Sequence, residues 1–265
     1  MKPAIYRFLL AAFCTTGVVA AAPLLSYEGF DYPPGSSIFL QNGGTGWSGA
    51  WDTPGGLDAT IAPSTLTFDS LATSGGALST AGFQPPNQGS SVATWVRLLS
   101  TSLGADNTTA YLSFLFRPDA GFGFYGGLNF GNAFAGLSGN QTNFGLEGPG
   151  NSLSLSTVAA TSGQTVLFVV RMDFLPGNDL LSLFLNPTPG LPEPAIPNVS
   201  RSDLDVGSVS FITVNNYGGF TTDEIRIGSS WESVTPTNAP EPALGAVAAL
   251  TMAAFVLLAR RRVRT

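Results

Sequence analysis

Residues 165–185 read TVLFVVRMDFLPGNDLLSLFL, and this stretch decides the fold. Apolar residues recur at every second position of residues 165–174, as along a β-strand, and residues 181–185 repeat that period. The shared apolar face comprises Val166, Phe168, Val170, Met172 and Phe174, with Arg171 and Asp173 on the other face. Between the two runs, Pro176-Gly177-Asn178-Asp179 is typical of a tight turn. The stretch therefore predicts an antiparallel hairpin with one apolar face.

The same kind of run recurs between clusters of Gly, Pro, Asn and Asp along residues 22–235. The other expected strands cover residues 64–69, 91–99, 109–117, 121–130, 143–147, 153–158, 208–215 and 224–227. No stretch between the two chain ends has a convincing helical period. About ten short strands imply an all-β domain, a two-sheet antiparallel jelly-roll sandwich.

The composition excludes several kinds of catalysis. The 265 residues include no histidine, a single cysteine and, at Lys2, a single lysine. A catalytic triad and the usual zinc, iron or copper sites therefore lack their residues. We expect no enzyme, no cofactor and no assigned metal ligands. Asp203 and Asp205 resemble a fragment of a calcium loop, which leaves a structural calcium ion open.

The N-terminus has the pattern of a secretory signal peptide over residues 1–21. Lys2 and Arg7 precede the apolar run of residues 8–22, which ends in small residues. Two alternatives are an uncleaved membrane anchor and a lipoprotein acylated at Cys14, although Phe13 before that cysteine is larger than usual.

The C-terminal segment, residues 236–265, has three parts. A polar linker leads into Pro240-Glu241-Pro242, an apolar run covers residues 243–259, and the basic residues Arg260, Arg261, Arg262 and Arg264 follow. The apolar run predicts a transmembrane helix close to the minimum length of about 17 residues. The arginines should remain cytoplasmic as an anchor, which places the sandwich domain outside the membrane.

This order of tripeptide, apolar helix and arginine cluster resembles the PEP-CTERM sorting signal. The resemblance implies that Pro240, Glu241 and Pro242 form the sorting motif, and that an exosortase in the membrane is a partner. It also implies delivery to the cell surface or to the extracellular matrix of a biofilm. The alternative is a plain C-terminal anchor that contains this tripeptide by chance.

Short motifs in the central region resemble those of concanavalin A-like (laminin G-like) jelly-roll domains. They are YEGFDY at residues 27–32, GWSGAW at 46–51, RMDF at 171–174, LFLNP at 183–187, and DEIRIG at 223–228 before Trp231. The resemblance implies the sandwich fold over residues 22–235, but that fold hosts lectins, glycanases and inert modules.

Aromatic residues beside amides are the candidates for carbohydrate binding. They are Tyr217, Asn215, Asn216, Trp47 and Trp51. An aromatic ring can cover the apolar face of a sugar while amides bond its hydroxyl groups. The alternative is that Trp47 and Trp51 fill the sandwich edge and Tyr217 packs a turn. Asp173 and Glu224 could be read as an acid/base pair, but Glu224 is expected to be structural, paired with Arg226 or Arg171.

Residues 22–239 contain 5 Arg and 16 Asp plus Glu, a net charge of −11. This excludes the basic patch that nucleic-acid binding requires. The sequence therefore predicts an exported, membrane-anchored, non-catalytic structural or adhesive component of a polysaccharide matrix. The first alternative is a carbohydrate-binding, lectin-like module, and the second is a glycoside hydrolase.

Overall fold

A computed structural model of the chain describes residues 24–54, 57–83 and 92–237, and these form a nearly all-β domain. The elements are β1 (Leu24–Glu28), β2 (Thr60–Ala62), β3 (Ala77–Ser79), β4 (Ala93–Leu103), β5 (Thr108–Phe130), β6 (Ala133–Leu137), β7 (Asn143–Gly148), η1 (Pro149–Asn151), β8 (Ser152–Ala159), β9 (Val166–Phe174), β10 (Asp179–Leu185), β11 (Val199–Leu204), β12 (Val209–Gly228) and α2 (Trp231–Val234).

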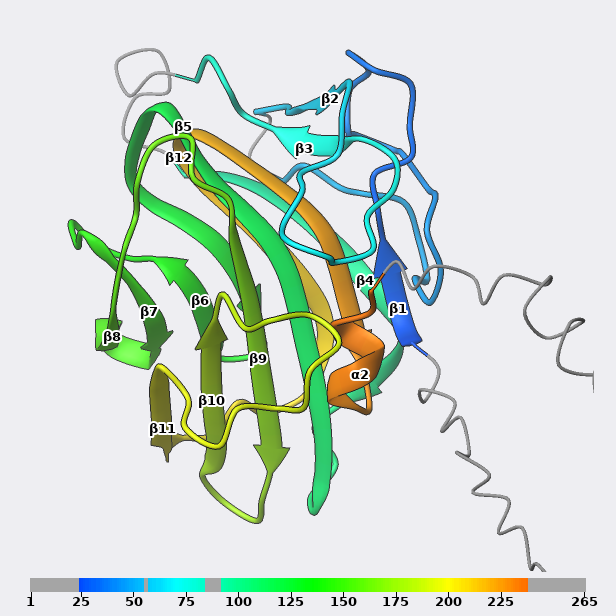
Figure 1. The fold of residues 1–265 in the computed structure, drawn as a ribbon. Coiled ribbons are helices and arrows are strands. Elements are labelled where there is room, and N and C mark those ends of the chain that lie inside the picture. The colour runs from blue at the N-terminus through cyan, green and yellow to red at the C-terminus, as the bar shows by residue number, and fades with distance from the viewer. Residues whose placement is uncertain (1–23, 55–56, 84–91, 238–265) are drawn as a thin grey trace, which may run out of the picture.

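Two layers share the long strands β5 and β12, which bend from one layer into the other (Figure 1). The first sheet runs β11-β10-β9-β5-β12-β1, with the β2–β3 hairpin also beside β12. The second sheet runs β8-β7-β6-β5-β12-β4. All of these pairings are antiparallel, so the expected antiparallel β architecture is confirmed.

The bend of β12 lies at Gly218, where the register with β5 shifts. Gly218 has a φ of 95°, and a Cβ atom there would lie 2.6 Å from the Gly123 nitrogen. A larger residue would strain the backbone and collide with β5. This glycine therefore permits one strand to serve both sheets.

Phenylalanine rings fill the space between the sheets. Phe168 stacks on Phe114 with ring centroids 4.7 Å apart, and Phe116 stacks on Phe220 at 5.0 Å. Every member of the apolar face predicted for residues 165–174 belongs to this core. The predicted hairpin is also confirmed, because β9 pairs with β10 across the Pro176–Asp179 turn.

A second apolar cluster covers the outer face of the first sheet. Leu167, Val169 and Phe184 point to this side and pack with Leu66 and Trp231. Trp231 begins α2, and its ring meets Phe184 edge-on at 5.1 Å. Loops and α2 therefore close this face, whereas the outer face of the second sheet carries no such layer among the described residues.

Several strand boundaries differ from the sequence-based expectation. Residues 109–117 and 121–130 belong to one strand, β5, and residues 208–215 and 224–227 belong to one strand, β12. Both continue because bulges absorb the Gly and Pro residues that indicated turns. Residues 64–69 form no strand, since Leu66 packs there as part of a covering loop.

A buried ion pair fixes the segment after β1 against β4. Arg97 Nη1 lies 2.7 Å from Glu28 Oε2, and both side chains are inaccessible to solvent. The same carboxylate oxygen accepts hydrogen bonds from Tyr32 and from Trp51 Nε1. The Arg97 guanidinium also lies over the rings of Trp47 and Trp51, 5.4 and 5.5 Å from their centroids. The cluster thus compensates a charge pair that burial alone would destabilise.

Both ends of the described domain meet at one corner. Leu71 forms a β-bridge with Thr237, and Ala72 N donates to Pro236 O. Leu24 and Pro236 line one small hollow there. The helices in the described part of the chain lack the length and apolarity to cross a bilayer. The expected signal peptide and the expected helix of residues 243–259 lie outside the described residues.

Removing one partner of the buried pair should destabilise the domain strongly. Glu28→Gln leaves the Arg97 cation buried without a counter-charge, so we expect a loss of about 3–5 kcal/mol in the free energy of unfolding. Urea denaturation of the full chain measures it. Glu232→Gln, at an exposed residue of α2, is the control and should change stability by less than about 0.5 kcal/mol. A loss for Glu28→Gln no larger than that of the control would contradict this account.

Candidate functional site

The outer face of the second sheet presents two parallel rows of side chains. The first row borders a groove described below and is called the groove row. It consists of the cross-strand partners Leu153, Glu147, Phe134, Asn129, Thr213 and Val96. The glycine row beside it consists of Leu155, Gly145, Gly136, Gly127, Asn215 and Thr94. Directly opposed residues of an antiparallel pair share a face, so each row crosses the sheet on one side.

The glycines of this row leave space for the Phe134 ring to pack on the sheet backbone. A Cβ atom at Gly127 or at Gly136 would come within 2.8 Å of Phe134 Cζ. The Phe134 ring therefore rests on the backbone of both glycines and is only 1% exposed. Tyr125 stacks on Phe134 with centroids 4.6 Å apart and planes 18° apart. Two stacked rings therefore cover the glycine backbone in the middle of the sheet.

A polar hollow of about 330 Å³, called the groove here, lies at one end of these rings. Its lining residues are Asn129, Gly131, Asn132, Phe134, Glu147, Gly148, Pro149, Gly150 and Asn151. The β5–β6 turn and η1 after β7 come together at this end, and both bring amide side chains. The groove therefore combines amides and one carboxylate with an aromatic wall.

The amides along the face are held by one another. Thr94 Oγ1 donates to Asn215 Oδ1 at 3.1 Å, and Asn215 Nδ2 donates to Asn129 Oδ1 at 2.6 Å. Asn132 Nδ2 donates to Asp205 O at 3.1 Å, which fixes the β5–β6 turn. These bonds restrict the side-chain rotamers before any ligand arrives, which lowers the entropy cost of binding.

Glu147 is the acidic group of the groove. The Ser138 hydroxyl donates a hydrogen bond to its Oε2 atom. Burial raises the pKa of Tyr125 above its usual value, and the charge of Glu147 raises it further. The Tyr125 hydroxyl therefore stays protonated at neutral pH and can donate a hydrogen bond.

Exposed apolar residues flank the groove on β12 and β4. Phe211 is 44% exposed and pairs with Leu98, which is 49% exposed. Phe211 lies two residues before Thr213, the partner of Asn129, so Phe211 and Asn129 are diagonal neighbours about 7–8 Å apart. An accessible aromatic ring thus lies beside the amides.

The structure divides the five residues that sequence reasoning proposed for carbohydrate binding. Asn215 and Tyr217 lie on the outer face of the second sheet, where Tyr217 packs on Phe124 with centroids 4.4 Å apart. Asn216 is fully buried and donates to Thr80. Trp51 is fully buried, and Trp47 belongs with it to the Glu28–Arg97 cluster. Asn216, Trp47 and Trp51 therefore do not line the groove, because strand alternation turns Asn216 inwards and the two tryptophan rings pack against the Arg97 guanidinium.

The other predicted groups lie elsewhere or outside the described residues. Asp203 forms an ion pair with Arg201 at 2.9 Å, and Asp205 Oδ1 accepts from Gly207 N. No group of three potential metal ligands occurs among the described residues. The motif Pro240-Glu241-Pro242 and the basic residues Arg260, Arg261, Arg262 and Arg264 lie outside them.

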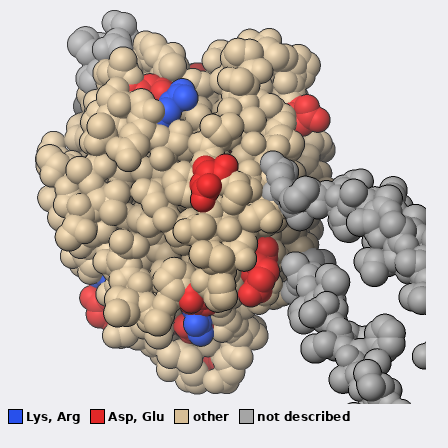
Figure 2. Space-filling view, in the orientation of Figure 1, with Lys and Arg blue, Asp and Glu red and all other residues tan. Residues whose placement is uncertain are grey.

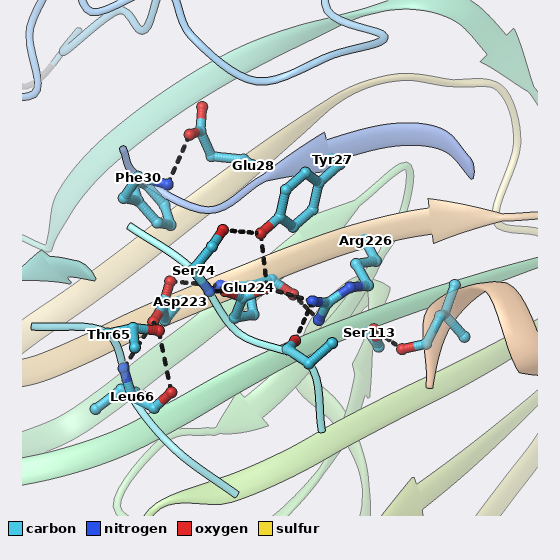
Figure 3. A network of polar contacts seen from close by, with 12 residues as sticks. Tyr27, Glu28, Phe30, Thr65, Leu66, Ser74, Ser113, Asp223, Glu224 and Arg226 are labelled. Atoms are coloured by element: carbon cyan, nitrogen blue, oxygen red, sulfur yellow. Dashed lines mark hydrogen bonds and ion pairs between the residues drawn. The ribbon is translucent and has the colours of Figure 1, made fainter. Parts of the chain in front are cut away.

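Figure 3 shows a second polar network, at a bulge of β12. Asp223 accepts hydrogen bonds from Thr65 Oγ1 and Leu66 N, each at 2.7 Å. Glu224 accepts from Tyr27 and pairs with Arg226, as expected for a structural role. Burial raises the pKa of Asp223 well above its usual value, and the neighbouring Glu224 raises it further.

The two carboxylates of this network anchor loops and are not accessible to a substrate. Asp223 and Glu224 are both 0% exposed. Asp173 belongs to a separate group on β9, where it pairs with Arg171 and accepts from Thr109. The hypothetical acid/base pair of Asp173 and Glu224 is therefore not formed.

Sequence reasoning missed Phe134, Glu147, Asn129 and Phe211. A signal for this region does exist, because Gly127, Gly136 and Gly145 recur at intervals of nine residues. The turn at Gly131-Asn132 and the β6–β7 connection, with its turn at Gly139-Asn140, lie about midway between them. A meander folded at those turns brings the three glycines side by side.

No protein-family model and no curated protein sequence matches this chain. Among solved structures, domain 4 of AbnA, a GH43 extracellular arabinanase from Geobacillus stearothermophilus in complex with arabinotriose, is similar with a TM-score of 0.50 and 14% identity. The match covers 81% of this chain and 97% of that domain. This similarity shows the fold alone, and it is consistent with the expected concanavalin A-like sandwich.

Two further structures are similar at lower scores. The endo-β-1,4-glucuronan lyase from the fungus Trichoderma reesei has a TM-score of 0.47 and 10% identity over 80% of this chain and 98% of its own. The carbohydrate binding module CBM66 from Bacillus subtilis has a TM-score of 0.41 and 12% identity over 68% of this chain and 95% of its own.

Alkaline pH should unfold the domain through its tyrosines. Burial raises the pKa of Tyr27, Tyr32 and Tyr111 from 10.0 to about 12. Because these values are raised above those of the unfolded chain, their contribution to stability is complete below pH 10 and is lost as the pH rises towards 12. Denaturation at a series of pH values, with phenolate absorbance, measures this loss. Ionisation of all phenols near pH 10 in a still-folded domain would contradict it.

Proposed function

We propose that this chain is an exported, non-catalytic carbohydrate-binding protein that presents the groove of its second sheet to extracellular polysaccharide. The observation that carries this proposal is the juxtaposition of fixed amides with aromatic rings on an uncovered sheet face. Asn129 and Asn132 line the groove, Phe134 forms its wall, and Phe211 lies beside it. This departs from the primary sequence-based expectation of a structural or adhesive component and favours its alternative.

The chemistry of the groove suits a sugar. Each amide offers both a donor and an acceptor, which matches hydroxyl groups that act as both. An aromatic ring such as Phe211 can pack against the C–H face of a sugar ring, and truncation of such anchors often costs binding energy. The groove volume of about 330 Å³ is at the lower end for small-molecule sites. One or two sugar units would fill it, with the remaining polymer lying across the sheet.

The acidic groups support binding without hydrolysis. Glycoside hydrolysis commonly uses two carboxylic groups about 5–10 Å apart. The residues that line the groove include one carboxylate, Glu147. The paired carboxylates Asp223 and Glu224 are buried and bonded to loops. A binding role requires no second acid.

The fold is compatible with this role. The similar domain 4 of AbnA was solved with arabinotriose bound, although an identity of 14% carries no residue of that site to this chain. A sandwich of this kind also serves other functions, so the proposal of carbohydrate binding depends on the groove and not on the fold.

The chain ends supply the second half of the proposal. The apolar run of residues 8–22 would export the chain, and Pro240-Glu241-Pro242 with the following helix and arginines would deliver it to an exosortase. The protein would then act at the cell surface or in the matrix, first tethered to the membrane.

Binding to a panel of polysaccharides tests the function. Affinity electrophoresis of the full-length chain through gels that contain arabinan, xylan, glucans or matrix polysaccharide should show retardation by at least one polymer. Retardation by none of them, with the domain folded, would overturn the proposal and favour the structural alternative. Release of reducing sugar would instead indicate a glycanase.

Loss of the accessible aromatic ring should weaken that binding. We expect Phe211→Ala to lower glycan affinity about tenfold, or ~1.4 kcal/mol, and to change the melting temperature no more than a control at a similarly exposed apolar residue. Leu175→Ala is the matched control, because Leu175 is 42% exposed on the β9–β10 turn of the other sheet. Equal affinities for the two variants would contradict the role of Phe211.

The proposed export and sorting predict the mass of the mature protein. Protein recovered from the cell surface should begin at Ala22 and lack the residues after the tripeptide at 240–242. Intact mass spectrometry reports both ends in one measurement. Changing Pro240 and Pro242 to Ala should retain the tail, and an unprocessed wild-type chain would contradict exosortase sorting.

A further inference from the structure

The groove row contains one charged side chain, and that charge is negative. Of its six residues only Glu147 is ionisable, and the glycine row beside it is uncharged. At the edge of the sheet, the exposed Asp52 forms a bridge with Val96 and adds a second acid. The two rows and the adjoining edge thus contain amides and two carboxylates, and they contain no cation.

One carboxylate oxygen of Glu147 has no hydrogen-bond donor among the described residues. Ser138 occupies Oε2, whereas Oε1 accepts no hydrogen bond from the described residues. Such an oxygen accepts hydrogen bonds from sugar hydroxyl groups, and it repels a carboxylate or a sulfate at the same place.

The arginine nearest to the groove is already paired. A Cβ atom on Gly148 would lie 3.3 Å from Arg201 Nη1, so this guanidinium is directly behind the groove wall. It donates to Asp203 and to Ser152, and the residue is 5% exposed. Arg201 therefore cannot offer the bidentate contact by which arginine binds an acidic group.

The net negative charge of the whole domain also disfavours the binding of acidic polymers. Residues 22–239 carry a net charge of −11, from 5 Arg against 16 Asp and Glu. Figure 2 shows one face of the molecule, on which the charged side chains are few and scattered over a mostly uncharged surface. At low ionic strength this charge opposes the approach of a polyanion, and no basic patch in the described residues of the groove offsets it.

We infer that the groove selects uncharged glycans and rejects uronate-rich or sulfated polymers. This inference rests on the proposed carbohydrate binding and specifies its ligand class. The amides and Phe211 provide the attraction, which any neutral sugar can use, and Glu147 provides the discrimination against acidic sugars.

A pair of derivatives of one polymer tests the inference. The polysaccharide that retards the full-length chain most is converted into a carboxymethyl ether and, at equal substitution, into a hydroxyethyl ether. The two substituents have similar size and differ in charge. We expect the carboxymethyl form to bind about tenfold more weakly than the hydroxyethyl form in low salt. The difference should shrink in 0.5 M NaCl, at a Debye length of about 4 Å.

Variants assign the effect to the groove. Glu147→Gln should narrow the difference in affinity between the two derivatives, whereas Glu232→Gln, at an exposed acidic residue of α2, should leave it unchanged. Equal or tighter binding of the carboxymethyl form by the wild-type chain would overturn the inference while the proposed function stands. An unchanged difference in Glu147→Gln would also overturn it. Binding of no polymer at all would instead overturn the proposed function.

Discussion

The pairing of β5 with β12 is the constraint on which the rest of this structure depends. Each strand belongs to both sheets, so the register of one layer is tied to that of the other. Phe116 and Phe220, one from each strand, stack at 5.0 Å near the bend and hold the layers together. A slip of one residue would turn every core side chain outwards. The same register positions the groove, because Asn129 and Thr213 face each other within this pair of strands.

The sequence predicts local β structure well and its continuity poorly. The hairpin of residues 165–185 was predictable because every second side chain packs in the core and the intervening turn has typical turn residues. Residues 117–123 also contain Pro and Gly, yet β5 passes through them as a bent strand. The small residues of β6 give little apolar contrast, although Ala133 and Ala135 are fully buried. A bend and a turn use the same residue types, and only the partner strand distinguishes them.

The site was partly foreseeable for a similar reason. Asn215 was found because it stands beside Asn216 and Tyr217, and strand alternation places Asn215 on the outer face of the sheet and Asn216 in the interior. Trp47 and Trp51 looked equally suitable, but the Arg97 cation requires aromatic cover in the interior. Asn129, Phe134 and Glu147 become neighbours only after two turns fold β5, β6 and β7 together. Such a juxtaposition is a property of the register, which a single sequence does not reveal.

The two ends of the described domain meet at one corner, and this bears on how the domain would be displayed. Leu24 and Thr237 belong to the side that carries β1 and α2, and β7 and β8 lie on the opposite side of Figure 1. Any support joined through either end would hold the sandwich by this corner. The strands of the proposed groove would then project away from the support.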